Sequence, residues 1–120
     1  MKHKMWYDNE NQILFLEFVD DFVKSDVDKL YSNIMEMLEE KPYRQLLVVM
    51  SSSHKVENRE TRELTNEALA KAKISEVGFV GGNAANRMIA KVLIKTGAIK
   101  TNGEFFKKRE NAIEWLKSKR

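Results

Sequence analysis

Residues 46–50 form an unbroken apolar run, Leu-Leu-Val-Val-Met, which is followed at once by the polar turn Ser51 to His54. An apolar run this short, ended by a polar turn, is typical of a β-strand that is buried on both faces. Both faces of a strand are covered only when helices pack on each side of its sheet. The run therefore predicts an α/β domain with this strand in its interior.

Two apolar stretches near the start of the chain, residues 4–7 and 13–19, flank the turn-forming sequence Asp8-Asn9-Glu10-Asn11. This arrangement predicts a β-hairpin. The second stretch has apolar residues at successive positions, so it could face apolar surroundings on both sides. We therefore expect residues 13–19 to lie inside the sheet.

The hairpin is followed by apolar residues at helical spacing, which continue to about Glu40. Pro42 ends this helix because proline lacks an amide hydrogen and constrains the residue before it. Ser25 is the expected cap at the start, and Asp26 and Asp28 favour the positive charge of the first turn. The pattern predicts one well-defined helix between the hairpin and the apolar run.

The rest of the chain alternates helices with strands. We expect a helix over residues 57–73, a strand over 74–80, a helix over about 84–96, a strand around 104–106 and a closing helix. Strands joined by single helices lie parallel with right-handed crossovers, so only the first hairpin is antiparallel. The prediction is a five-stranded mixed, mostly parallel sheet flanked by four helices, with the order β-β-α-β-α-β-α-β-α. Residues 1–120 form a single domain.

The amino-acid composition argues against several kinds of site. The 120 residues are 42% apolar and 32% charged, which is typical of a globular domain with a charged exterior. No cysteine is present, and His3 and His54 are the only histidines, so we expect no disulfide, metal site or cofactor. The first residues, Met-Lys-His-Lys-Met-Trp, lack the apolar core expected of a signal peptide, and no apolar run approaches the length of a membrane span. A cytoplasmic protein is the expectation.

The net charge of +3 conceals an asymmetry between the two halves. Residues 1–60 hold 8 basic and 12 acidic side chains, hence −4, whereas residues 61–120 hold 13 and 6, hence +7. Part of the excess lies in Lys107-Lys108-Arg109 and in residues 117–120. No aromatic side chains that could stack on bases alternate with these charges. We interpret them as solvated helix ends and expect no nucleic acid partner.

Ligands of parallel sheets gather beyond the carboxyl ends of the strands, near the starts of helices. Two loops should meet at that edge, one after the apolar run and one at Gly81-Gly82-Asn83. Two glycines allow a tight turn and expose amides that favour an anion, although a plain strand-to-helix turn capped by Asn83 explains them equally. The candidate contact residues for a ligand or partner are Ser51, Ser52, Ser53, His54, Gly81, Gly82, Asn83, Asn86 and Arg87.

Catalysis at this edge is not expected. A serine nucleophile needs a base within reach and a third group that orients the base. Ser52 and His54 are near neighbours in the chain, with no Gly-x-Ser-x-Gly motif and no acidic partner indicated. We interpret the acidic pairs Asp20-Asp21 and Glu39-Glu40 as solvated surface charges and not as acid–base catalysts. We therefore predict that the protein is not an enzyme.

Two local patterns, together with the element order, resemble the small SpoIIAA-like proteins of the STAS superfamily. The patterns are residues 56–64, VENRETREL, and residues 105–116, FFKKRENAIEWL. This superfamily includes anti-sigma-factor antagonists and many standalone bacterial domains. The antagonists are phosphorylated in an Asp-Ser-Ser/Thr-Gly motif, where this chain reads Arg59-Glu60-Thr61-Arg62. The resemblance thus implies Thr61 as a phosphorylation site, and an ordinary first-turn residue is the alternative.

The leading functional hypothesis is a non-enzymatic regulatory or protein-interaction module with an unknown protein partner. The alternative is a carrier of a small apolar or lipid-like ligand, which would bind between the third helix and the sheet. Met88, Ile89, Val92, Leu93 and Ile94 make the apolar stripe of that helix wider than one buried face requires. The same excess predicts a homodimer that uses Leu93 and Ile94.

Overall fold

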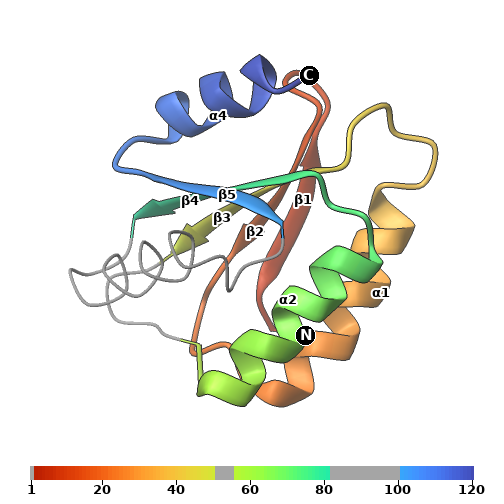
Figure 1. Cartoon of the computed structure of the whole chain (residues 1–120), viewed down its shortest axis with the longest axis vertical. Helices are drawn as coiled ribbons and strands as arrows, with labels where there is room; N and C mark the ends of the chain where they lie inside the picture. Colours follow the sequence, from red (N-terminus) through yellow and green to blue (C-terminus); the bar gives the residue numbers. More distant parts are fainter. Residues whose placement is uncertain (1, 51–55, 82–100) are drawn as a thin grey trace.

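The computed structural model describes residues 2–50, 56–81 and 101–120 of the chain. In these residues five strands form one sheet, with helices against both of its faces (Figure 1). The elements in chain order are β1 (Lys4–Asp8), β2 (Ile13–Glu17), the short 3-10 helix η1 (Lys24–Asp26), α1 (Val27–Met37), β3 (Gln45–Met50), α2 (Arg59–Lys71), β4 (Glu76–Gly81), β5 (Asn102–Phe106) and α4 (Arg109–Ser118).

The strands lie side by side in their chain order, β1-β2-β3-β4-β5. β1 and β2 form the predicted antiparallel hairpin, and each later strand pairs in parallel with the one before it. The carboxylate of Asp8 accepts hydrogen bonds from the amides of Glu10 and Asn11, which fixes the hairpin turn. The mixed sheet is confirmed, and the apolar run of β3 occupies its middle position.

The alternation of side chains in β3 supplies both layers of the core. Leu46 and Val48 face the layer that contains α1 and α2, whereas Leu47 faces the layer that contains α4. All three side chains are buried. Figure 1 shows α1 and α2 side by side on one face of the sheet and α4 on the other. A strand with only one buried face has alternating apolar and polar residues. Because helices cover both faces of β3, its residues 46–50 are all apolar.

Helix α4 packs directly on β4, where it faces Gly78. A side-chain carbon at Gly78 of β4 would lie 3.5 Å from the Cβ atom of Ala112 and 3.7 Å from Leu116. Ala112 and Leu116 are completely buried, while Trp115 is half-buried with its ring 5.6 Å from that of Phe106.

Two predictions need correction. The described residues contain three α-helices instead of four, and the helix expected over residues 84–96 lies outside them. Ser25 does not cap the first long helix, because it lies inside η1 and neither η1 nor α1 has a side-chain cap. None of the helices among the described residues has the length and apolar character needed to cross a membrane.

Candidate functional site

The carboxyl ends of β3 and β4 meet at one edge of the sheet. Their last residues, Met50 and Gly81, are direct partners in the parallel pairing, so the chain leaves both strands at the same level. Gly81 has a φ of +84°, and a Cβ atom there would lie 2.7 Å from the carbonyl oxygen of Met50. Glycine is therefore required at this position, and a tight turn is the role that the sequence predicted for the pair Gly81-Gly82.

Most of the candidate contact residues lie outside the part of the chain that the structure describes. These are Ser51, Ser52, Ser53, His54, Gly82, Asn83, Asn86 and Arg87. Of the predicted contact set, the described residues include Gly81 alone, and they place it at the expected edge. The contact role of the whole set, Gly81 included, stays a prediction.

The described part of this edge continues along the chain after β2 and before α2. Val56 forms a parallel bridge with Phe22, and the amide of Glu57 donates to the carbonyl oxygen of Phe22 at 2.8 Å. The amide of Phe18 donates to the carbonyl oxygen of Val49 at 3.1 Å. We call residues 18–22, 56–58, Met50 and Gly81 the carboxyl rim. Backbone hydrogen bonds join its segments, so the rim is a fixed platform.

Helix α2 begins at the rim. The side chain of Asn58 accepts a hydrogen bond from the Thr61 amide at 2.8 Å, which caps the helix. The Thr61 hydroxyl donates to Oε1 of Glu57 at 3.2 Å, and the same oxygen accepts the Lys24 amide at 3.0 Å. Thr61 is completely buried. A kinase could reach this hydroxyl only if the first turn of α2 opened, and its phosphorylation stays a prediction.

A buried histidine–aspartate pair lies beneath the rim. Nε2 of His3 donates to Oδ2 of Asp26 at 3.1 Å, and Nδ1 accepts the amide of Val19 at 3.3 Å. Because Nδ1 is an acceptor, the ring hydrogen resides on Nε2. The imidazole packs against the rings of Phe18 and Phe22, each 5.3 Å away. Both ring nitrogens are therefore used in holding the rim to β1 and η1.

Sequence reasoning missed this pair. Asp26 was expected at the first turn of a helix and His3 had no assigned role. In the structure, Oδ2 of Asp26 is bonded to His3 and also accepts a hydrogen bond from the amide of Val23 at 3.0 Å, just before η1 begins. The available signal was an isolated histidine directly before an apolar strand, together with two phenylalanines after the next strand. This signal indicates that the His3 ring is buried, but it does not identify Asp26 as its partner.

The surface beside the rim is charged. Lys24 and Glu60 form a hydrogen-bonded ion pair at 2.9 Å. The hydrogen bond to Glu60 raises the pKa of the Lys24 ammonium above its usual value. Val19 is an exception, since this apolar residue is 39% exposed. Among the described residues, no group of three or more histidine, aspartate or glutamate side chains could hold a metal ion.

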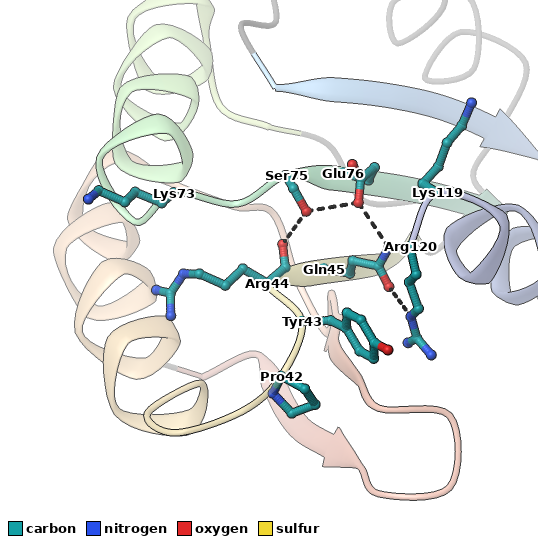
Figure 2. Close-up of a pocket in the computed structure, with 9 residues that line it drawn as sticks. All are labelled: Pro42, Tyr43, Arg44, Gln45, Lys73, Ser75, Glu76, Lys119 and Arg120. Carbon is teal, nitrogen blue, oxygen red and sulfur yellow. Dashed lines mark hydrogen bonds between the residues drawn. The ribbon is translucent and has the colours of Figure 1, made fainter.

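A pocket of about 270 Å³ lies at the opposite, amino end of β3 and β4 (Figure 2). Its lining residues are Pro42, Tyr43, Arg44, Gln45, Lys73, Ser75, Glu76, Lys119 and Arg120. The buried amide of Gln45 donates to Glu76 at 2.9 Å and to the Leu116 carbonyl oxygen at 2.6 Å. Nε of Arg120 donates to the Gln45 oxygen at 3.1 Å.

The basic side chains of this pocket do not converge on a common point. Figure 2 shows the charged ends of Arg44 and Lys73 extending to the left and that of Lys119 extending to the upper right. The Arg44 guanidinium donates to the Ala72 carbonyl oxygen at 2.9 Å, and the Arg120 guanidinium lies 4.0 Å from the centre of the Tyr43 ring. The arrangement is a hydrogen-bond network that joins the end of α4 to the sheet, not a cradle for an anion.

The fold defines the class of protein first. The structure is similar to the crystal structure of an uncharacterized protein of the DUF3478 family, with a SpoIIAA-like fold, from Shewanella loihica PV-4. The TM-score is 0.63 at 12% sequence identity, and the match covers 95% of this chain and 91% of that chain. The resemblance to SpoIIAA-like proteins is thus confirmed at the level of the fold.

The family follows from the sequence. A family model described as a domain of unknown function, DUF7793, matches residues 5–120, and the chain belongs to this family. No curated protein matches the sequence.

Proposed function

We propose that this protein is a non-enzymatic interaction module of the SpoIIAA-like type, which contacts a partner protein with the carboxyl rim. The observation that carries the proposal is the exposed Val19 on a rim that backbone hydrogen bonds hold rigid. Preformed surfaces of this kind bind with little loss of conformational entropy. An exposed apolar side chain on such a surface suits contact with a protein.

The chemical groups around the rim support binding over catalysis. The His3 ring uses both nitrogens in structural hydrogen bonds, and the Thr61 hydroxyl is buried against Glu57. A general base or nucleophile needs a free functional atom that faces a substrate. An enzymatic alternative would depend on Ser52 and His54, which lie outside the described residues. It predicts that Ser52→Ala or His54→Ala abolishes a turnover without unfolding the chain.

The partner contact is tested with two matched variants. Val19 and Met35 are large apolar residues with similar exposure, 39% and 42%, and Met35 lies on α1, away from the rim. Immobilised wild-type protein, Val19→Gln and Met35→Gln are incubated with an extract of the source organism, and bound proteins are quantified by mass spectrometry. We expect one partner to be retained by wild type and Met35→Gln and reduced about tenfold or more by Val19→Gln, as for a central interface residue. Equal recovery on all three would contradict the proposal.

A carrier of an apolar ligand is the alternative function. Its predicted site beneath residues 84–96 lies outside the described residues, and the pocket in Figure 2 has a charged lining that does not suit an apolar molecule. Native mass spectrometry of freshly purified protein distinguishes the two functions. A ligand that copurifies in stoichiometric amount would support the carrier and would count against the interaction module.

A further inference from the structure

Strand β1 is the outermost strand on its side of the described sheet. It pairs with β2 through five consecutive residue pairs, from Lys4–Glu17 to Asp8–Ile13, and no described strand pairs with its other edge. In an antiparallel ladder every second residue turns its N–H and C=O groups away from its partner strand. The outer edge of β1 therefore presents backbone donors and acceptors that another strand could use.

The middle of this edge carries no proline, bulge or charge that would oppose strand pairing. Natural edge strands are protected by a proline, a bulge or a charge near the middle of the strand. β1 is regular and reads Lys4-Met5-Trp6-Tyr7-Asp8, with its charges only at the two ends. Its three central side chains are half-buried within the single chain. The centre of β1 is thus an incompletely covered apolar strand edge.

The charges of β1 suit antiparallel pairing with a second copy of the same strand, because Lys4 and Asp8 lie at equal distances on either side of Trp6. When two copies pair antiparallel with Trp6 opposite Trp6, Lys4 of each copy lies opposite Asp8 of the other. Met5 then lies opposite Tyr7. Parallel pairing would place lysine beside lysine and aspartate beside aspartate, which is unfavourable. The same polarity continues outside the strand, where Lys2 precedes it and Glu10 follows it.

Lys4 and Asp8 bring opposite charges to the two ends of this edge. The Lys4 side chain is 68% exposed, and its ion pair with Glu17 is long, at 3.9 Å. Asp8 binds amide groups of the hairpin turn, and these bonds hold the pKa of its carboxyl below the usual value, so the negative charge is kept. Opposite charges directly across a strand pair stabilise the pairing.

We propose that the occupant of this edge is a second copy of the same chain. The two β1 strands pair antiparallel about Trp6, with reciprocal Lys4–Asp8 contacts, and join two five-stranded sheets into one continuous sheet. This contact leaves the carboxyl rim free, and it is independent of the proposed partner function. It also differs from the dimer that the sequence predicted through Leu93 and Ile94.

Charge reversal tests the pairing. In sedimentation equilibrium, wild type should approach twice its mass of 14.0 kDa as the concentration rises. Lys4→Glu places two like charges opposite each other and should weaken the dimer about tenfold or more. Lys107→Glu is the matched control, because this exposed lysine follows β5 at the other side of the sheet and the net charge changes equally. Lys4→Glu/Asp8→Asn should recover part of the affinity, since asparagine still suits the turn but removes the repulsion.

Cysteine cross-linking tests the register. The chain has no native cysteine, so a single Trp6→Cys would face its own copy on the twofold axis and form a disulfide-linked dimer under mild oxidation. Lys4→Cys would be separated from the same residue of the partner by about 14 Å along the strand, at about 3.4 Å per residue, and should not cross-link. Circular dichroism checks that each variant is folded.

Three results would overturn the proposal. One is a wild-type protein that stays monomeric at millimolar concentration. Another is a dimer that Lys4→Glu and Lys107→Glu affect equally. The third is a dimer that Ile94→Lys separates while Lys4→Glu leaves it intact, which would assign the contact to the third predicted helix.

Discussion

At Gly81 the backbone leaves β4 with a φ of +84°, a conformation in which an L side chain is strained. The neighbouring Met50 carbonyl oxygen also occupies the space that a Cβ atom would need, at 2.7 Å. Sequence alone predicts that one of the two adjacent glycines makes the turn. It cannot identify which one, because that depends on how far the pairing with β3 continues.

Gly81→Ala should lower the free energy of unfolding by roughly 1–3 kcal/mol, since both the backbone strain and the contact with Met50 are unfavourable. The matched control is Gly78→Ala, because its new Cβ atom would make ordinary contacts of 3.5 Å or more. Urea unfolding compares the two variants. Equal stability of Gly81→Ala and Gly78→Ala would contradict the role of Gly81.

Asp8 makes the hairpin turn sensitive to pH. The Asn11 side-chain amide, followed by backbone amides, donates to its carboxylate and holds the pKa of Asp8 below the unfolded value of about 3.9. A depressed pKa contributes stability that is fully present above the unfolded value and is lost as the pH falls through the folded value. The stability difference between wild type and Asp8→Asn should therefore be constant near neutral pH and shrink below about pH 4. Chemical unfolding at a series of pH values measures it, and a difference that grows in acid would be the opposite sign.

At the scale of elements, the segment from β2 to α1 shows what local patterns miss. The caps and the first turn of a helix are local features, so Ser25 and Asp26 both fit an N-terminus. The structure instead uses Asp26 for a long-range bond to His3, 23 residues away in the chain. The local pattern locates the helix correctly, but it cannot tell a cap from a buried carboxylate that binds another element.

His3→Ala should lower the free energy of unfolding by about 2–4 kcal/mol, because it leaves a cavity and removes a partner from Asp26 and Val19. Lys2→Ala is the control at the neighbouring position, where an exposed ion pair with Asp20 at 3.3 Å should contribute little. Both are measured by urea unfolding. A loss below about 0.5 kcal/mol for His3→Ala, within the range of ordinary surface substitutions, would show that the pair does not hold the rim.

The start of α2 depends on Asn58. Replacing it with alanine removes the acceptor for the Thr61 amide and should cost about 1 kcal/mol, whereas Asn58→Asp keeps a cap and should cost little. Hydrogen exchange of the first-turn amides is the measurement. Protection that is lost equally in both variants would indicate that something other than the cap holds this turn.

At the scale of the whole molecule, the periodic patterns predicted most of the architecture. The continuous run of residues 46–50 placed β3 in the interior, and the hairpin and crossover rules gave the direction of each strand. They also predicted correctly that β3 and β4 end at a common edge. The fixed platform of the rim could not be predicted, because it depends on contacts between residues such as Phe22 and Val56 that are distant in the chain.

Gln45 is a second long-range feature, at the amino end of the sheet. It is 1% exposed at the start of an apolar strand, and it connects Glu76, Leu116 and Arg120. Gln45→Leu should destabilise the protein by roughly 1–3 kcal/mol, because the Leu116 carbonyl oxygen loses its partner in a buried position. Lys119→Ala, at the edge of the same pocket, should leave the stability nearly unchanged. Thermal unfolding of both variants tests this, and a neutral Gln45→Leu would mean that the network does not stabilise the docking of α4.

The most direct test of the proposed interaction module is cross-linking from the rim itself. A photoreactive phenylalanine derivative is placed at position 19 or at the equally exposed position 35, and the protein is irradiated in an extract of the source organism. The account predicts a specific protein adduct from position 19 and none from position 35. The same adduct from both positions, or from position 35 alone, would contradict a contact at the carboxyl rim.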